Sequence, residues 1–176
     1  MVDVCQKEVG IVFKKGDVFI YGTSGVCRIE DICIKDLGMM KKEYYILRPV
    51  YDERSILYIP TDSEKLAVRA KTLLTEKEVY EIADNVSEKY EWVIDDKQRN
   101  EVFKNILEEG KSADMAKLIY TLHCRKKELA QKSKKLRGAD ENILQRAEKL
   151  LYEEFAYVLG VKPEEVPDII KNRANT

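Results

Sequence analysis

The run Lys15-Gly16-Asp17-Val18-Phe19-Ile20-Tyr21-Gly22-Thr23-Ser24-Gly25-Val26-Cys27-Arg28-Ile29-Glu30 is the most informative part of this sequence. β-Branched and aromatic residues lead into a glycine-bounded turn and then into a second such run. This is the pattern of two strands joined by a short connection. Similar runs recur at 42–48 and 55–60. The front of the chain therefore predicts a small antiparallel barrel.

The predicted barrel has five strands, at 17–21, 26–34, 42–48, 55–60 and 66–69. Leu37-Gly38-Met39 predicts the first hairpin turn, because glycine adopts positive φ without steric cost. Pro60 ends the fourth strand, since proline cannot donate to the ladder. Five short strands with hairpin links predict a Tudor- or SH3-like five-stranded antiparallel β-barrel over residues 1–70.

The periodicity changes at Thr75, where Thr75-Glu76-Lys77-Glu78 predicts a capping box at a helix start. Apolar residues then recur at helical spacing. The expected helices begin at Thr75 and cover about 97–109, 113–133 and 139–159, and a short last one begins at Pro163. Each helix has one polar face, so the helices are expected to pack as a compact all-α bundle of about five. The fold class is α+β with two domains, 1–70 and 75–176.

Composition limits the possible functions. The 176 residues are 36% charged, yet the formal net charge is only −1, so attraction to nucleic acid requires local clustering of basic residues. No apolar run approaches the roughly 18 residues that would span a membrane. The first residues lack the pattern of a signal peptide. We expect a cytoplasmic protein with no membrane partner.

Catalytic signatures are missing from the sequence. Cys5, Cys27, Cys33 and Cys124 are scattered, which indicates free thiols rather than a metal site. The single histidine, His123, is expected at the surface or at a packing boundary, with a general base as the alternative. No nucleophile elbow, phosphate-binding loop or zinc motif is present. We expect no enzyme, no cofactor and no small-molecule substrate.

Basic residues cluster in the second half. Between Arg125 and Arg137, seven cations accompany a single acid, Glu128. One interpretation is a phosphate-binding strip, and the other is a solvated helix end where cations favour the negative end of the dipole. The candidate DNA-binding cations are Lys97, Arg99, Lys104, Arg125, Lys126, Lys132, Lys134 and Lys135.

Trp92, the only tryptophan, precedes the helix that carries Lys97 and Arg99. Two interpretations remain open for it. It is either an anchor between helices or an apolar wedge that inserts between base steps in a minor groove. Acidic Asp95 and Asp96 nearby weigh against the wedge.

Four segments of the first half resemble the CarD/CdnL transcription regulators, namely Phe13 through Tyr21, the turn that ends at Gly25-Val26, Lys42 through Leu47, and Tyr58-Ile59-Pro60. The same half is similar to the RNA-polymerase-interacting domain of the transcription–repair coupling factor. The similarity continues in the helices, through Met115 to Leu122 and Leu136 to Gly160.

The resemblance implies a Tudor-like domain that binds the β subunit of bacterial RNA polymerase. It also implies a helical domain that contacts promoter DNA at the upstream edge of the bubble and prolongs the open complex, without enzymatic turnover. By this resemblance, Lys35 stands where the family has a basic residue that contacts the polymerase. Tyr58 stands where the family has an arginine, and Arg54 is a candidate to replace the charge of that arginine. Trp92 lies about four residues upstream of the family tryptophan. The runner-up function is a protein–protein adaptor whose barrel binds a peptide or strand edge without DNA contact.

Overall fold

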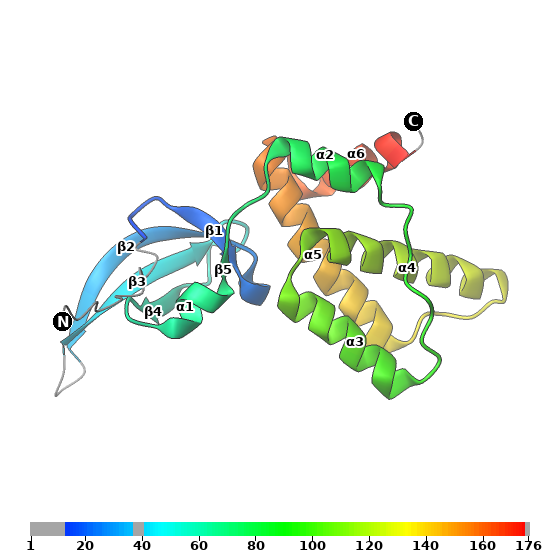
Figure 1. The fold of residues 1–176 in the computed structure, drawn as a ribbon, viewed down its shortest axis with the longest axis horizontal. Coiled ribbons are helices and arrows are strands. Elements are labelled where there is room, and N and C mark those ends of the chain that lie inside the picture. The colour runs from blue at the N-terminus through cyan, green and yellow to red at the C-terminus, as the bar shows by residue number, and fades with distance from the viewer. Residues whose placement is uncertain (1–12, 37–40, 175–176) are drawn as a thin grey trace, which may run out of the picture.

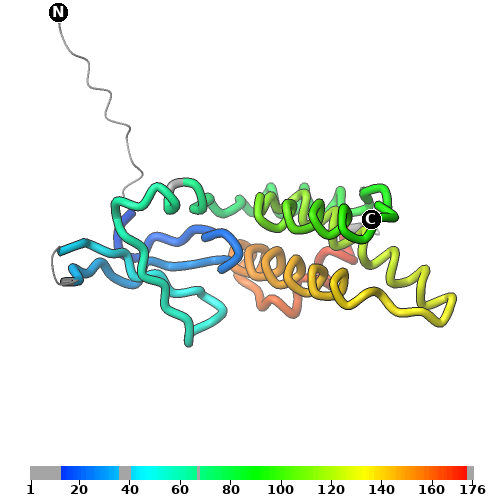
Figure 2. Tube along the Cα trace, turned by 90° about the horizontal axis from the view of Figure 1, so that it is seen from below, coloured from blue at the N-terminus to red at the C-terminus, as the bar shows by residue number. Residues whose placement is uncertain are grey.

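The structure is a computed structural model that describes residues 13–36 and 41–174. Figure 1 shows the strands gathered at one side of the molecule and helices α2 to α6 at the other. The view in Figure 2 shows these two parts following one another along the long axis. The hairpin turn predicted at Leu37-Gly38-Met39, like residues 1–12 of the predicted first domain, lies outside the described residues.

The strands form one antiparallel sheet in the order β4-β3-β2-β1-β5. They are β1 (Val18–Tyr21), β2 (Val26–Asp36), β3 (Lys41–Pro49), β4 (Leu57–Pro60) and β5 (Ala70–Lys71). The glycine-bounded turn between β1 and β2 is a short 3-10 helix, η1 (Gly22–Ser24). The α+β class and the antiparallel strands are therefore confirmed.

The prediction of a closed barrel is wrong, because the sheet is open. β4 and β5 are its two edges, and no pairing joins them within the described residues. The expected closing strand at 66–69 is instead part of helix α1 (Glu64–Arg69). Glutamate, lysine, leucine, alanine and arginine there all favour a helix, and Leu66 is buried against the sheet. Only two residues remain for β5, which pairs with β1.

One face of the sheet carries a hydrophobic cluster of Phe19, Cys27, Ile29, Tyr45, Leu47, Ile59 and Leu66. The ring of Phe13 stacks on Phe19 with centroids 4.5 Å apart. Side chains alternate between the faces of a strand, so the neighbours of these residues point the other way. A register shift between Ile29 and Asp31 changes which residues of β2 share each face.

The second half contains α2 (Glu76–Asp84), α3 (Asp96–Glu109), α4 (Ser112–Gln131), α5 (Gly138–Leu159) and α6 (Val166–Ala174). The predicted capping box starts α2, where the Glu78 amide donates to Thr75 Oγ1 over 3.3 Å and the Thr75 amide donates to the Glu78 carboxylate over 2.7 Å. Pro163 begins a 3-10 turn, η2 (Pro163–Glu165), that leads into α6.

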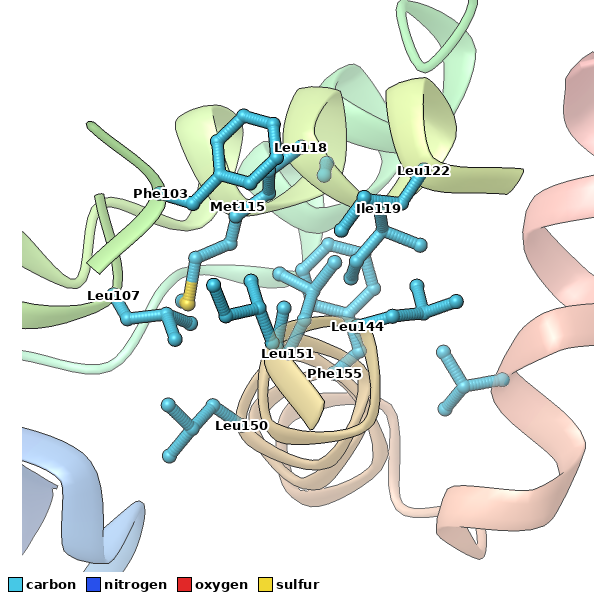
Figure 3. Packing of buried hydrophobic residues seen from close by; sticks show 14 of the residues in the cluster. Phe103, Leu107, Met115, Leu118, Ile119, Leu122, Leu144, Leu150, Leu151 and Phe155 are labelled. Carbon is cyan, nitrogen blue, oxygen red and sulfur yellow. The ribbon is translucent and has the colours of Figure 1, made fainter. Parts of the chain in front are cut away.

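A second hydrophobic cluster joins these helices. Figure 3 shows Phe103 of α3, Leu118 of α4 and Leu151 of α5 in its interior. All three are almost completely buried. Each side chain of this size stabilises the fold by about 1.5–3 kcal/mol through its removal from water. Because this cluster buries one face of each of α3, α4 and α5, it determines which faces of these helices are exposed to solvent.

The two halves meet at the η1 turn and at the segment before α2. Gly25 has φ +73°, and a Cβ there would lie 2.7 Å from a carboxylate oxygen of Glu153 on α5. The neighbouring Glu154 accepts hydrogen bonds from the Leu74 amide (3.2 Å) and the Ser112 hydroxyl (2.6 Å). Burial raises the pKa of the Glu154 carboxyl. The predicted domain boundary at 70–74 stays a prediction, since Tyr51 from the first half also packs on the helical cluster.

Candidate functional site

Lys35 and Tyr58 come together on the outer face of the sheet, although β3 separates their strands. Lys35 Nζ lies 3.3 Å from the centroid of the Tyr58 ring, a cation–π contact. Tyr58 pairs with Ile46 across β3–β4, on the face opposite the buried Tyr45 and Leu47. The Tyr58 side chain is 46% exposed. Two of the three predicted polymerase contacts therefore form one accessible unit.

Arg54, the third predicted contact, is exposed in the turn before β4, where its amide donates to Asp52. Sequence reasoning missed Arg48, which lies on β3 and shares the outer face with Ile46. Arg48 Nε donates to the Glu30 carboxylate over 2.9 Å, and this bond raises the pKa of the guanidinium. In the sequence, Tyr44, Ile46 and Arg48 alternate with Tyr45 and Leu47, and this alternation could have placed Arg48 on the outer face. We call Lys35, Tyr44, Ile46, Arg48 and Tyr58 the docking face.

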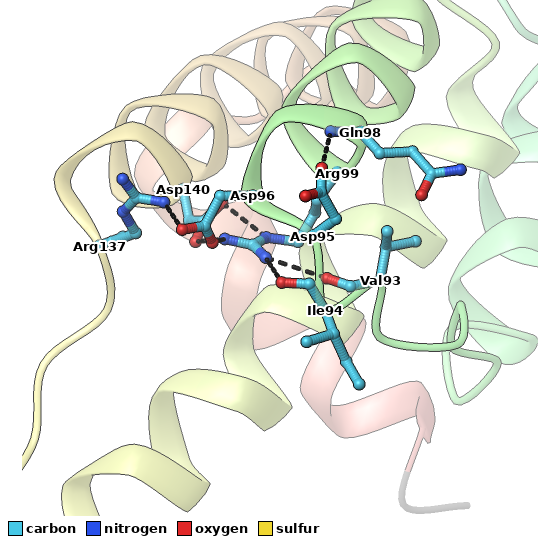
Figure 4. Close-up of polar contacts among 8 residues, drawn as sticks. All are labelled: Val93, Ile94, Asp95, Asp96, Gln98, Arg99, Arg137 and Asp140. Carbon is cyan, nitrogen blue, oxygen red and sulfur yellow. Dashed lines mark hydrogen bonds and ion pairs between the residues drawn. The ribbon is translucent and has the colours of Figure 1, made fainter.

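Arg99 is a buried structural cation, which corrects its predicted placement among the DNA contacts. Its side chain is 3% exposed and forms a two-bond contact with Asp140, with Nε–Oδ1 at 3.1 Å and Nη2–Oδ2 at 2.9 Å. A further bond of 2.6 Å joins Arg99 Nη2 to Asp96. Figure 4 shows the guanidinium also donating to the carbonyls of Val93 and Ile94. These bonds engage all three guanidinium nitrogens inside the protein.

This network fixes the start of α3 against the start of α5. Hydrogen bonds from Arg99, and secondarily from Arg137, lower the pKa of the Asp96 carboxyl. Arg137, which precedes α5, also forms an ion pair with Asp96 (Figure 4). The cost of removing a buried ion pair from water is offset only when further hydrogen bonds satisfy its partners, and Arg99 has such bonds to Asp96 and to the carbonyls of Val93 and Ile94. The network therefore places Arg137, the last residue before α5, beside the first residue of α3.

Trp92 is half-buried and packs against the helical cluster. Its ring meets Phe103 edge-on with centroids 6.2 Å apart. The guanidinium carbons of Arg99 and Arg125 lie 4.5 Å and 4.9 Å from the ring centroid. Arg125 is also bonded to Glu128 over 3.0 Å. These contacts favour the anchor interpretation of Trp92, and the wedge stays a prediction.

The segment between α2 and α3 has a second aromatic anchor in Tyr90. Its amide donates to Thr121 Oγ1 over 2.9 Å, and its hydroxyl donates to Asp114 over 3.1 Å. Burial, with a smaller effect from Asp114, raises the pKa of Tyr90 to about 12. Tyr90 and Trp92 together hold this segment on α3 and α4.

All six predicted DNA-binding lysines are exposed on the helical half, and they differ in whether an acidic residue pairs with them. Lys97 and Lys104 lie on α3, and Lys132, Lys134 and Lys135 follow α4. Among the described residues, none of the five has an acidic side chain within ion-pair distance. Lys126 differs, because it is paired with Glu141 at 2.8 Å. We call these five residues the exposed lysines.

His123 is exposed and lies 2.7 Å from a carboxylate oxygen of Glu148. Cys27, Cys33 and Cys124 are free thiols, and burial raises the pKa of the Cys27 thiol to about 12. Within residues 13–36 and 41–174, no group of three or more metal-ligating side chains converges. A helix of the length and apolarity needed to cross a membrane is likewise not found in that part of the chain.

Comparison with known families supports the assignment of the first half. Residues 13–70 match the family model described as the CarD-like/TRCF RID domain. This match covers β1 to β4, α1 and the first residue of β5, so this part of the chain is a CarD-like/TRCF RID domain, as its motifs indicate. The helical half lies outside the match. A search of curated proteins found no match to this chain.

Proposed function

We propose that this protein is a bacterial, cytoplasmic regulator of transcription initiation of the CarD/CdnL type that acts without enzymatic turnover. Its RID domain, with a Tudor-like arrangement of strands, binds the β subunit of RNA polymerase. Its bundle of helices α2 to α6 contacts promoter DNA at the upstream edge of the bubble and prolongs the open complex. The observation that carries this proposal is the family match over residues 13–70 together with the Lys35–Tyr58 pair on the outer face.

The docking face has the composition of a protein interface. It combines two tyrosines and an arginine, residue types that are enriched in binding hot spots. Lys35 adds a cation that, among the described residues, has no acidic partner within ion-pair distance. A partner surface with an exposed carboxylate would complement it.

The DNA contact is assigned to the exposed lysines. These lysines supply positive charge that can bind backbone phosphates. Such contacts would position the protein on DNA without recognising its base sequence. A protein already held on polymerase needs little DNA affinity of its own, because its effective concentration near the promoter is high. The net charge of −1 is compatible with this arrangement.

The polymerase contact is tested by affinity measurements with purified bacterial core enzyme. The double variant Lys35→Glu and Tyr58→Ala is expected to bind at least about tenfold more weakly, since it removes an aromatic anchor and reverses a charge. Lys162→Glu, an exposed charge reversal on the helical half, is the control and should bind as the unmodified protein does. Unchanged affinity of the double variant would show that the docking face is elsewhere.

The DNA contact is tested with a forked promoter fragment at increasing salt. Binding should weaken steeply as the salt concentration rises. Replacement of Lys132, Lys134 and Lys135 by glutamine should flatten the logarithmic salt dependence by about one unit for each phosphate that the protein no longer binds. Lys162→Gln on the loop after α5 serves as the control.

The open sheet gives the adaptor function one specific observation in its favour. Among the described residues, edge strand β4 pairs only with β3, so its outer backbone groups offer a template for strand addition by a peptide. An adaptor of this kind would retain polymerase or peptide binding and show no salt-dependent affinity for the forked fragment.

A further inference from the structure

A cavity of about 460 Å³ lies at the junction of the two halves. Its walls come from β1 and η1, from the end of α1 and β5, and from α3 and α5. A volume of this size lies within the range of small-molecule sites, roughly 300–1,000 Å³. The cavity is separate from the docking face, to which none of its lining residues belongs.

Positive charge dominates the lining of this cavity. Arg69 at the end of α1, Lys71 on β5 and Arg146 on α5 all line it. Glu108 is the one acidic residue among the described lining residues. Within the described part of the chain, none of the three cations has an acidic side chain at ion-pair distance. Three like charges around one cavity repel one another, and a bound anion would relieve that repulsion.

The placement of Lys71 has a local cause. Its Nζ lies 3.4 Å from the point where a Cβ of Gly110 would stand, at the carboxyl end of α3. Gly110 ends that helix with φ +58°, in the left-handed region that glycine adopts readily. The helix end carries partial negative charge, which favours an ammonium group there. Lys71 is therefore held at the cavity instead of extending into solvent.

The lining also contains an apolar part, formed by Ile20 and Val68. Val68 is 78% exposed, an unusual position for a valine on a helix whose neighbour Leu66 is buried. A ligand that places an apolar group against these two side chains would cover this surface. The combination indicates a molecule with an anionic end and an apolar end.

We propose that this cavity binds a small phosphorylated molecule of nucleoside-diphosphate size, with the phosphates on Arg69, Lys71 and Arg146 and the apolar part on Ile20 and Val68. Arginine is well suited to this, because its planar group bonds phosphate oxygens in pairs. Arg69 and Lys71 belong to the first half and Arg146 to the second. A bound ligand therefore bridges the halves and stabilises their relative placement.

This inference goes beyond the proposed function, because it needs neither polymerase nor promoter DNA. It is tested by isothermal titration of the full chain alone with ADP, with GDP and with inorganic pyrophosphate. The expected result is saturable binding of at least one nucleotide, with pyrophosphate weaker because it lacks the apolar part. The nucleotide should also raise the unfolding temperature, since a ligand that binds only the folded state stabilises it.

Two charge reversals at the cavity sharpen the test. Arg69→Glu and Arg146→Glu should each weaken nucleotide binding about tenfold or more, because each removes a charge-assisted contact. Lys14→Glu changes the net charge equally and should bind as before. Circular dichroism of each variant checks that the fold is retained.

Three results would overturn the proposal. One is the absence of binding by any of the three probes at millimolar concentration. Another is nucleotide binding that both arginine variants retain. The third is displacement of the nucleotide by a short DNA duplex that binds more tightly through the same two arginines, which would make the cavity a DNA-phosphate site.

Discussion

Lys35 in the sheet and Arg99 in the helical half are both cations that lie on an aromatic ring, yet their surroundings differ completely. Lys35 covers the exposed Tyr58 and has no acidic partner within ion-pair distance among the described residues. Arg99 covers the half-buried Trp92 and is enclosed by Asp96 and Asp140. The comparison shows that burial and two carboxylate partners make the Arg99 charge part of the internal structure, whereas the Lys35 charge is left for a partner molecule.

The two sites also differ in what a mutation should change. Loss of the Arg99 network should reduce stability, because a buried charge without its partner is costly. Loss of Lys35 should reduce binding and leave stability almost unchanged, since exposed substitutions have small effects.

The largest effect is expected for Asp140→Ala. This substitution leaves Arg99 buried without its two-bond partner, and it should lower the free energy of unfolding by about 3–5 kcal/mol. Urea unfolding followed by circular dichroism measures the change. Asn142→Ala, an exposed substitution on the same helix, is the control. A loss no larger than that of the control would mean that the network contributes little to stability.

Trp92→Ala should be the next most damaging change. Trp92 is only half-buried, so the expected loss is about 2–3 kcal/mol, below the value for a fully buried tryptophan. Tyr58→Ala, the matching aromatic on the docking face, should cost less than about 1 kcal/mol. Both are measured by thermal and urea unfolding. A Trp92 variant of unchanged stability that shortens the lifetime of the open complex would instead favour the DNA wedge.

Asp96→Asn should have a smaller effect that depends on pH. The pKa of Asp96 is lowered in the folded state, chiefly by its hydrogen bond with Arg99. The carboxylate therefore contributes stability above the pKa of an unfolded aspartate, and this contribution is lost as the pH falls through the folded-state pKa. The stability difference between the two proteins should be largest near neutral pH and shrink in acid. A difference that stays constant across the acid range would contradict this account.

Lys35→Met is expected to have the smallest effect on stability, within about 0.5 kcal/mol. Methionine keeps most of the apolar stem over Tyr58 and removes only the charge. The same variant should bind polymerase core enzyme more weakly, as measured by biolayer interferometry. A large loss of stability in this variant would show that the cation–π contact is a structural one, like that of Arg99.

The local features of the fold were predictable from sequence, and the contacts between distant segments were not. The β1–η1–β2 unit and the capping box at Thr75 depend on neighbouring residues, and both are confirmed. Residues 66–69 were predicted as a strand because a short apolar run fits either structure, and only their packing distinguishes a helix. Because residues 66–69 belong to α1, only the two residues of β5 are left to pair with β1, and the sheet does not close within the described residues.

The contacts within the candidate site were likewise not predictable from neighbouring residues in the sequence. Arg99 was assigned to DNA because it lies near other basic residues, whereas its partner Asp140 is 41 positions away in the sequence. No local pattern predicts such a pair. The cavity at the junction was missed for a similar reason, since Arg69, Lys71 and Arg146 come from three elements of the fold.

The most direct test of the docking face is site-specific photo-cross-linking to bacterial RNA polymerase. The photoreactive residue p-benzoylphenylalanine is placed at position 58 on the docking face and, in a separate protein, at position 68, where Val68 is exposed on α1. The account predicts a cross-link from position 58 that maps to the β subunit and none from position 68. No cross-link from position 58, or equal cross-linking from both positions, would contradict it.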